Sequence, residues 1–207
     1  MKVSFACIVE GHGETSALPI LLRRIAASID SRIELKIPNP IRIQRSKVHI
    51  PGELEKAVHL AAGKVAPDGR ILIVMDADDD CPATLAPTIL KRAWAARPDL
   101  TISVVLPNRE FESWFLAAAA SLGERFESPG DLRTPADAEG IRGAKEWLRE
   151  RLRGGRYSPT VDQPSLAAIF DLQEARSAPS FDKLWREMER LLRDCDASGF
   201  DEEMSSP

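Results

Sequence analysis

The sequence predicts an α/β protein in which helices flank a mainly parallel sheet. Two continuous apolar runs of strand length, residues 3–9 and 71–75, are each followed directly by a cluster of acidic residues. Apolar runs without polar alternation are typical of strands that are covered on both faces, as in a parallel sheet. Helical patterns lie between these runs, and such alternation favours a layered α/β fold.

The first predicted strand leads into a glycine loop and a helix. Residues 3–9 end at the loop EGHGE, residues 10–14. Leucines and isoleucines then recur at helical spacing, which predicts a helix with Ser16 as its cap and Pro19 in its first turn.

The remaining elements are predicted from apolar periodicity and from turn residues. The further extended segments are residues 33–37, 41–43, 71–75 and 101–106. The further helices are residues 53–62, 83–96, 109–120, 141–152, 165–175 and 181–192.

The pattern changes after residue 122, where proline, glycine and acidic residues become frequent. Beyond this stretch only helical patterns follow, and the chain ends on a polar, acidic segment. We therefore predict an α/β domain over residues 1–122, a linker or long loop over 123–140, a helical C-terminal extension over 141–193 and a flexible acidic tail over 194–207.

Composition and charge restrict the classes of function. The 207 residues are 43% hydrophobic and 29% charged, and 28 Lys and Arg against 32 Asp and Glu give a net charge of −4. No global positive field draws such a protein to nucleic acid or membrane, so any polyanion must be bound locally. No apolar stretch is long enough to suggest a membrane span, and Glu10 interrupts the first apolar run before a signal peptide can form. The three cysteines suggest neither disulfides nor a zinc site, so we expect a cytoplasmic protein.

Acidic residues follow both apolar strands at the point where each strand ends. Glu10 follows the first strand, and Asp76, Asp78 and Asp80 follow the strand at 71–75. Ligands bind at the carboxyl ends of strands in open parallel sheets, so the carboxylates of neighbouring strands meet there. Like charges at such distances require raised pKa values or a bound cation, and carboxylate oxygens suit Mg²⁺ or Mn²⁺.

The glycine loop suits the phosphate part of a ligand at the same place. Gly11 and Gly13 let the backbone approach a phosphate closely, beside the start of a helix. Glu14 either joins the carboxylate cluster or is favoured at the helix start by the helix dipole. No further cofactor is indicated, because Ser16 stands where a dinucleotide fingerprint has its third glycine.

These residues resemble a known superfamily. Glu10-Gly11 after a first strand and Asp76-x-Asp78 after a later one are similar to the Toprim domain of topoisomerases, primases and recombination-associated nucleases. A closer similarity is to an uncharacterised family of small stand-alone Toprim-like proteins. The runs that carry it are IVEGHGE at 8–14, DADDDCP at 76–82 and NREFESWFL at 108–116, with Tyr157, Asp162-Gln163 and the SFxKL segment at 180–184.

The resemblance implies a Rossmann-like, Toprim-type fold that binds Mg²⁺. It implies that Asp76 and Asp78 hold the metal ion and that Glu10 is a general acid or base, or a further ligand. Glu112 matches an acidic residue of the nuclease-type branch, in which two metal ions can activate water and stabilise the leaving oxygen. Tyr157, the only tyrosine, lies outside the core, which argues against strand passage.

Three functions are compatible with these residues. The first is a Mg²⁺-dependent nuclease or phosphodiester hydrolase with Glu10, Asp76 and Asp78 as catalytic residues, acting on nucleic acid, DNA in preference to RNA, in DNA repair or defence. The second is a non-catalytic module that binds metal and nucleic acid beside a separate ATPase, since the chain lacks a P-loop. The third is a small-molecule phosphoesterase. 

Basic residues recur along one predicted helix, at Arg142, Lys145, Arg149 and Arg153. Such a stripe grips a nucleic-acid backbone or, because Glu146 and its neighbours interleave, forms a solvated face with salt bridges.

Overall fold

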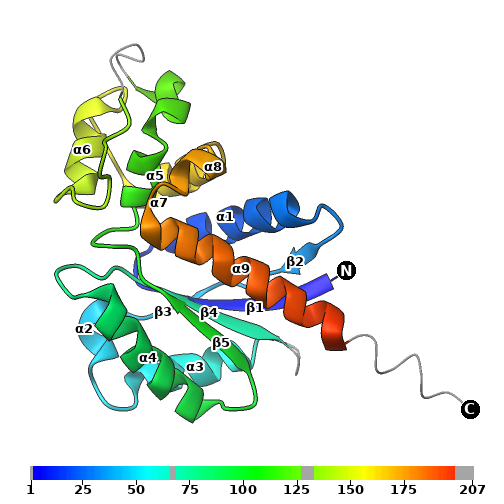
Figure 1. The fold of residues 1–207 in the computed structure, drawn as a ribbon. Helices are drawn as coiled ribbons and strands as arrows, with labels where there is room; N and C mark the ends of the chain where they lie inside the picture. The colour runs from blue at the N-terminus through cyan, green and yellow to red at the C-terminus, as the bar shows by residue number, and fades with distance from the viewer. Residues whose placement is uncertain (1, 66–68, 127–132, 199–207) are drawn as a thin grey trace, which may run out of the picture.

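The structure is a computed structural model, and it describes residues 2–65, 69–126 and 133–198. Its centre is a fully parallel sheet in the order β2-β1-β4-β5, with β3 also paired to β1 (Figure 1). The strands are β1 (Lys2–Val9), β2 (Glu34–Lys36), β3 (Ile41–Arg42), β4 (Arg70–Val74) and β5 (Thr101–Val105). The predicted α/β class with a parallel sheet is confirmed.

Helices cover both faces of the sheet, as expected for strands without polar alternation. The helices are α1 (Glu14–Ile29), α2 (Arg45–Val48), α3 (Glu53–Ala62), α4 (Pro82–Ala96), α5 (Ser113–Ala117), the 3-10 helix η1 (Ala119–Arg125), α6 (Ala144–Arg151), α7 (Pro159–Ala167), α8 (Leu172–Ala175) and α9 (Pro179–Ser198). Figure 1 shows α2, α3 and α4 on one face, α1 and α9 on the other, and α5 to α8 gathered beyond one end of the strands.

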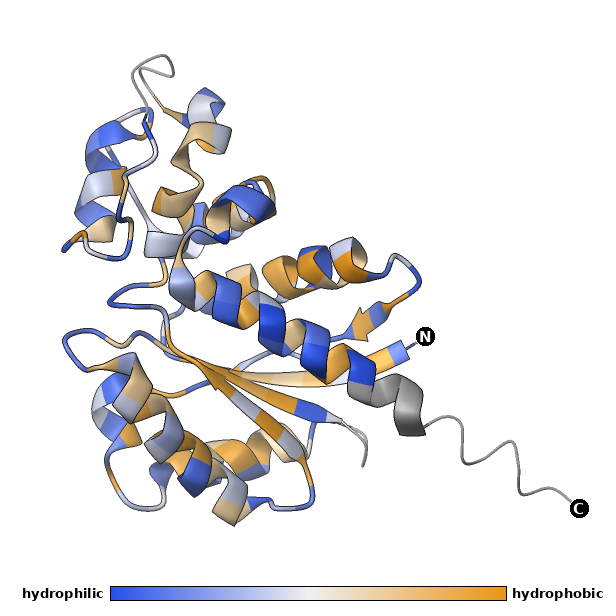
Figure 2. Cartoon of the chain, in the orientation of Figure 1, coloured by the Kyte–Doolittle hydropathy of each residue, from blue (hydrophilic) through white to orange (hydrophobic). Residues whose placement is uncertain are grey.

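Two apolar clusters hold these layers together. One joins α3 and α4 to the sheet through residues such as Ile8, Ile73 and Ile89. The other includes Phe5 of β1 and Phe181 of α9, so the C-terminal helices share a core with the sheet. Figure 2 shows the apolar faces of these helices turned towards the strands and towards one another. The helical C-terminal part therefore covers one face of the sheet.

The start of the first helix differs from the prediction. The helix α1 begins at Glu14 and Gly13 is its N-cap, so the predicted cap at Ser16 and the predicted first-turn position of Pro19 are wrong. The reason is a tight loop: the backbone N–H of Glu10 donates to the Glu14 carboxylate at 3.1 Å, which places the first helical turn directly after β1.

The predicted helix over residues 109–120 is shorter than expected. Arg109 has a left-handed backbone with φ of 69°, and the N–H of Phe111 donates to the Asp76 side chain. Residues 109–112 therefore form a loop that is bonded to the end of β4, and only Ser113–Ala117 is α-helical. Likewise the predicted helix at 165–175 is two helices, α7 and α8, because the Asp171 side chain caps α8.

The predicted linker and tail are only partly described. Residues 127–132 and 199–207 lie outside the described residues. Within 133–140, Glu139 is buried and accepts hydrogen bonds from the backbone N–H and the hydroxyl of Ser180, so this end of the segment is anchored to α9. The helix α9 continues to Ser198, and the predicted flexibility of the tail from residue 194 stays a prediction. None of the helices in the described part of the chain has both the length and the apolar character that crossing a membrane requires.

Candidate functional site

The acidic residues lie where the parallel strands end. The strands β1 and β4 are neighbours, paired from Phe5 with Arg70 to Ile8 with Ile73, and β5 pairs with β4. Because all three run in the same direction, the residues that follow them share one edge of the sheet (Figure 1). The predicted meeting of Glu10 and Asp76 depends on their strands being neighbours, and β1 and β4 are neighbours.

Asp76 is the most deeply placed aspartate of the loop after β4. It is 6% exposed, and its Oδ1 accepts a hydrogen bond of 2.8 Å from the backbone N–H of Phe111. Burial raises the pKa of Asp76 well above its usual value, and the nearby carboxylates of Glu14 and Glu112 raise it further. Ionisation of Asp76 is therefore unfavourable unless a cation lies close to its carboxylate.

Glu10 lies directly beside Asp76. The backbone N–H of Asp76 donates to the Glu10 carboxylate, while burial and the charge of Asp78 raise the Glu10 pKa. The Oε2 atom of Glu10 is buried and has no hydrogen-bond partner. A buried carboxylate oxygen without a partner is costly, and it is an open ligand position for a cation.

Glu14 joins this cluster from the first turn of α1. Its side chain is buried, and burial raises its pKa to about 7 although the backbone N–H groups of Gly11 and Glu10 bond to it. A Cβ atom on Gly11 would lie 2.7 Å from Glu14 Oε1, so glycine at position 11 leaves room for this carboxylate. The interpretation of Glu14 as part of the cluster is therefore favoured over a helix-dipole residue in solvent.

Gly13 is explained by packing. A Cβ atom there would lie 2.1 Å from Gln163 Oε1 and 2.3 Å from the carbonyl oxygen of Pro159, both in α7. The loop thus needs glycine so that α7 can approach it. The assignment of Gly11 and Gly13 to phosphate binding stays a prediction.

Glu112 comes from the loop after β5 and is completely buried. Its Oε1 accepts hydrogen bonds from the Tyr157 hydroxyl at 2.9 Å and from Gln163 Nε2 at 2.8 Å. Its Oε2 has no hydrogen-bond partner. Two residues of the C-terminal part therefore orient a carboxylate that points its second oxygen into the acidic cluster.

Lys145, in the first turn of α6, faces the cluster. Its Nζ lies 3.9 Å from Asp76 Oδ2, 3.5 Å from Glu110 Oε2 and 3.7 Å from Glu112 Oε2. Although burial opposes its charged form, the three carboxylates raise the Lys145 pKa above its usual value. Sequence reasoning placed Lys145 in a basic stripe and missed its place in the site, because no local pattern shows that α6 folds onto the sheet edge.

The other aspartates of the loop after β4 turn towards arginines. Asp80 pairs with Arg45, and Asp78, with its own φ of 52°, lies 3.9 Å from the same guanidinium. Asp79 accepts hydrogen bonds from Arg142 at 2.7 Å and from Arg109 at 3.3 Å. The structure therefore brings Glu10, Asp76 and Glu112 together with Glu14, whereas Asp78 and Asp80 face Arg45.

The cluster is not a preformed metal cage. Among residues 2–65, 69–126 and 133–193, no three His, Cys, Asp or Glu side chains stand in an arrangement that could hold a metal ion. The assignment of Glu10, Asp76, Asp78, Asp80 and Glu112 as metal ligands stays a prediction.

The basic stripe is only partly engaged. Arg142 pairs with Asp79 and Lys145 with the carboxylates, and the guanidinium of Arg153 bonds to the carbonyl oxygen of Phe126. Arg149 is exposed on α6. The stripe thus begins in the site and continues outwards, although its role in nucleic-acid binding stays a prediction.

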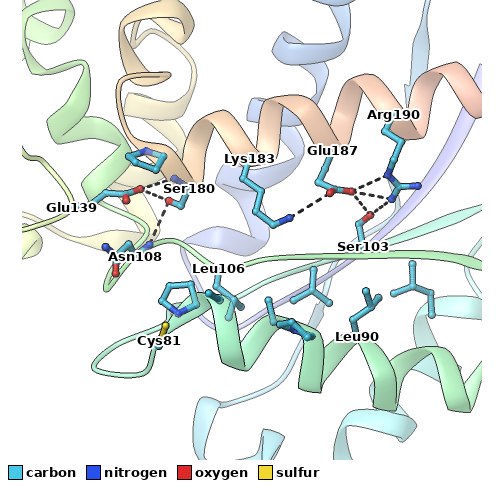
Figure 3. Close-up of a pocket in the computed structure, with 17 residues that line it drawn as sticks. Cys81, Leu90, Ser103, Leu106, Asn108, Glu139, Ser180, Lys183, Glu187 and Arg190 are labelled. Atoms are coloured by element: carbon cyan, nitrogen blue, oxygen red, sulfur yellow. Dashed lines mark hydrogen bonds and ion pairs between the residues drawn. The ribbon is translucent and has the colours of Figure 1, made fainter.

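A groove of about 560 Å³ lies between α4 and α9 along β5, the last strand of the sheet (Figure 3). Apolar side chains of α4 and β5 form most of its wall, while Lys183, Glu187 and Arg190 project from α9. None of the predicted metal ligands lines this groove. The groove is therefore separate from the acidic cluster.

The comparison with protein families identifies the chain at the level of family only. No curated protein and no solved structure matches it. A family model described as "Domain of unknown function (DUF4276)" matches residues 9–189, a span that includes every residue of the acidic cluster. The chain belongs to the DUF4276 family.

Proposed function

We propose that this protein is a Toprim-like, Mg²⁺- or Mn²⁺-dependent phosphodiester hydrolase that cleaves nucleic acid. The observation that carries the proposal is the meeting of Glu10, Asp76 and Glu112 at the carboxyl ends of three neighbouring parallel strands. Asp76 and Glu112 are buried beside other acids, and both share the Lys145 ammonium at 3.7–3.9 Å. A bound divalent cation would offset the repulsion between these carboxylates.

The donor set fits a hard divalent cation. Glu10 Oε2 and Glu112 Oε2 are buried oxygens without hydrogen-bond partners, and Asp76 Oδ2 faces the same cluster. Glu10, Asp76 and Glu112 would hold the ion, with Asp78 and Asp80 as further ligands on the neighbouring loop. Bound there, the ion would lower the pKa of a water molecule and neutralise charge on a phosphate oxygen.

The chain's own residues supply the rest of a phosphate site. Arg45, Arg109 and Arg142 surround the cluster, and their present partners are the aspartates of the loop after β4. Arginine binds phosphate oxygens through two parallel N–H donors, so these side chains would hold the nucleic-acid backbone. Glu10 would either hold the ion or, where Asp76 and Glu112 hold it alone, exchange a proton with the attacking water or the leaving oxygen.

The direct test is cleavage by the purified protein. Single- and double-stranded DNA and RNA are incubated with Mg²⁺ or Mn²⁺, and the products are separated on gels. We expect cleavage by the wild type and by Asp99→Asn. Asp99 is a matched control because it precedes β5, at the amino ends of the strands and away from the acidic cluster. Asp76→Asn should lose cleavage, and activity that persists in this variant would contradict the proposal.

The same experiment separates the two other candidate functions. Turnover of small phosphomonoesters without cleavage of any polymer would identify a phosphoesterase. Metal-dependent binding of DNA without cleavage, which turns into cleavage when a co-purifying ATPase is added, would identify the partner module of an ATPase.

A further inference from the structure

The acidic cluster contains its own cation. Lys145 Nζ lies between 3.5 and 3.9 Å from carboxylate oxygens of Asp76, Glu110 and Glu112, which follow two different strands. The nearby arginines are instead paired with Asp78, Asp79 and Asp80. These arginines are Arg45, Arg109 and Arg142. Lys145 is therefore the cation that contacts both buried carboxylates, Asp76 and Glu112.

The contacts of Lys145 are those of an exchangeable counter-ion. Charge-assisted hydrogen bonds between ammonium and carboxylate groups are typically about 2.7–2.9 Å long, and all three separations are longer. Glu112 Oε2 is completely buried and lacks a hydrogen bond even with Lys145 beside it. The Lys145 side chain is 40% exposed, so a path to solvent is open. The ammonium thus balances charge without completing the bonding of the carboxylates.

We propose that Lys145 switches partners: its ammonium neutralises Asp76, Glu110 and Glu112 while the site is free of metal, and it pairs with a substrate phosphate once a divalent cation binds Glu10, Asp76 and Glu112. The inference rests on the function proposed above. Its physical basis is repulsion, because a divalent cation and an ammonium group a few ångströms apart repel each other strongly in a partly buried site. A phosphate is the nearest alternative anion that a displaced lysine would meet in a phosphodiester site.

The switch is visible in the wild-type protein as a change in lysine reactivity. The protein is acetylated briefly under three conditions, namely with chelator, with Mg²⁺, and with Ca²⁺ plus a single-stranded oligonucleotide, and acetylation is quantified by mass spectrometry. We expect Lys145 to react slowly with chelator, severalfold faster with Mg²⁺, and slowly again with the oligonucleotide. Lys56, an exposed lysine on α3, is the internal control and should react equally in all three.

A pair of variants tests the same exchange through metal affinity. Lys145→Met replaces the lysine by an unbranched, uncharged side chain that is one atom shorter, and Lys56→Met makes the same change away from the acidic cluster. In calorimetric titration with Mn²⁺, Lys145→Met should bind about tenfold more tightly than the wild type, because displacement of the ammonium is no longer needed. Lys145→Met should also bind the oligonucleotide more weakly in the presence of Ca²⁺, whereas Lys56→Met should match the wild type in both titrations.

The outcomes distinguish this inference from the proposed function. If the wild type binds Mn²⁺ while Lys145→Met binds it equally or more weakly, and Lys145 acetylation does not respond to Mg²⁺, the partner switch is wrong and the metal site stands. If neither protein binds Mn²⁺, both proposals fail. Circular dichroism of Lys145→Met confirms that any change in affinity belongs to a folded protein.

Discussion

Replacing Glu14 by glutamine should stabilise the metal-free protein at alkaline pH. The Glu14 side chain is buried, and its pKa of about 7 compares with 4.5 for an ordinary glutamate. At 1.36 kcal/mol for each pH unit, ionising this carboxyl in the folded protein costs about 3 kcal/mol more than in the unfolded chain. Glutamine keeps the shape without that cost, but loses one of the backbone hydrogen bonds that Glu14 accepts, worth about 1 kcal/mol.

The sign of the effect depends on pH. A raised pKa means that the folded protein binds more protons than the unfolded chain, so the wild type loses stability as pH rises from about 4.5 towards 7 and above. Glu14→Gln lacks this loss. The difference in unfolding free energy between variant and wild type should therefore grow by about 2.5 kcal/mol from pH 5 to pH 8, ending near 2 kcal/mol in favour of the variant.

Urea unfolding in the presence of a chelator, followed by circular dichroism at several pH values, measures this difference. The change in the difference with pH is the decisive quantity, because the lost hydrogen bond contributes equally at every pH. A difference between Glu14→Gln and wild type that stays constant across this range would refute the argument that Glu14 is an uncompensated buried carboxylate.

Three further predictions concern the same edge of the sheet. Tyr157→Phe removes a donor to the buried Glu112 carboxylate and should lower the unfolding free energy by about 1.5–3 kcal/mol in denaturant titrations, and an unchanged midpoint would contradict the contact. Gly13→Ala places a methyl group against α7 and should cost more than about 3 kcal/mol, whereas Gly63→Ala, where a Cβ meets nothing closer than 3.7 Å, should change stability by less than about 0.5 kcal/mol, as melting curves would show. Millimolar Mg²⁺ should raise the melting temperature of the wild type and leave that of Asp76→Asn unchanged, because a ligand stabilises the folded state only where it binds, and an equal shift in both proteins would place the ion elsewhere.

The sheet and its acidic edge are predictable from sequence because their signals are local. A mainly apolar run marks β1 and β4, and the acids that follow directly after each strand must lie at its carboxyl end. Parallel pairing then brings Glu10 and Asp76 together without knowledge of any side-chain contact. The boundaries of α3 were predicted to the residue, because its apolar residues recur at helical spacing.

The rest of the site depends on contacts between distant parts of the chain. Tyr157 and Gln163 bond to Glu112 across 45 and 51 residues, and no periodicity or spacing indicates such a partner. Lys145 has the helical spacing of a surface stripe, so its place among the carboxylates follows only from how α6 folds back. The predicted helix cap at Ser16 is wrong for a related reason. The Glu14 carboxylate accepts a hydrogen bond from the preceding loop, so the helix begins before Ser16.

Anomalous diffraction from a crystal grown with Mn²⁺ would show whether the carboxylates of the acidic cluster bind a metal ion. We predict a manganese peak bounded by the carboxylates of Glu10, Asp76 and Glu112, with the Lys145 ammonium moved away from them. A crystal grown at millimolar Mn²⁺ in which these side chains are well ordered, no manganese is bound and Lys145 still lies between Asp76 and Glu112 would contradict the proposed metal site.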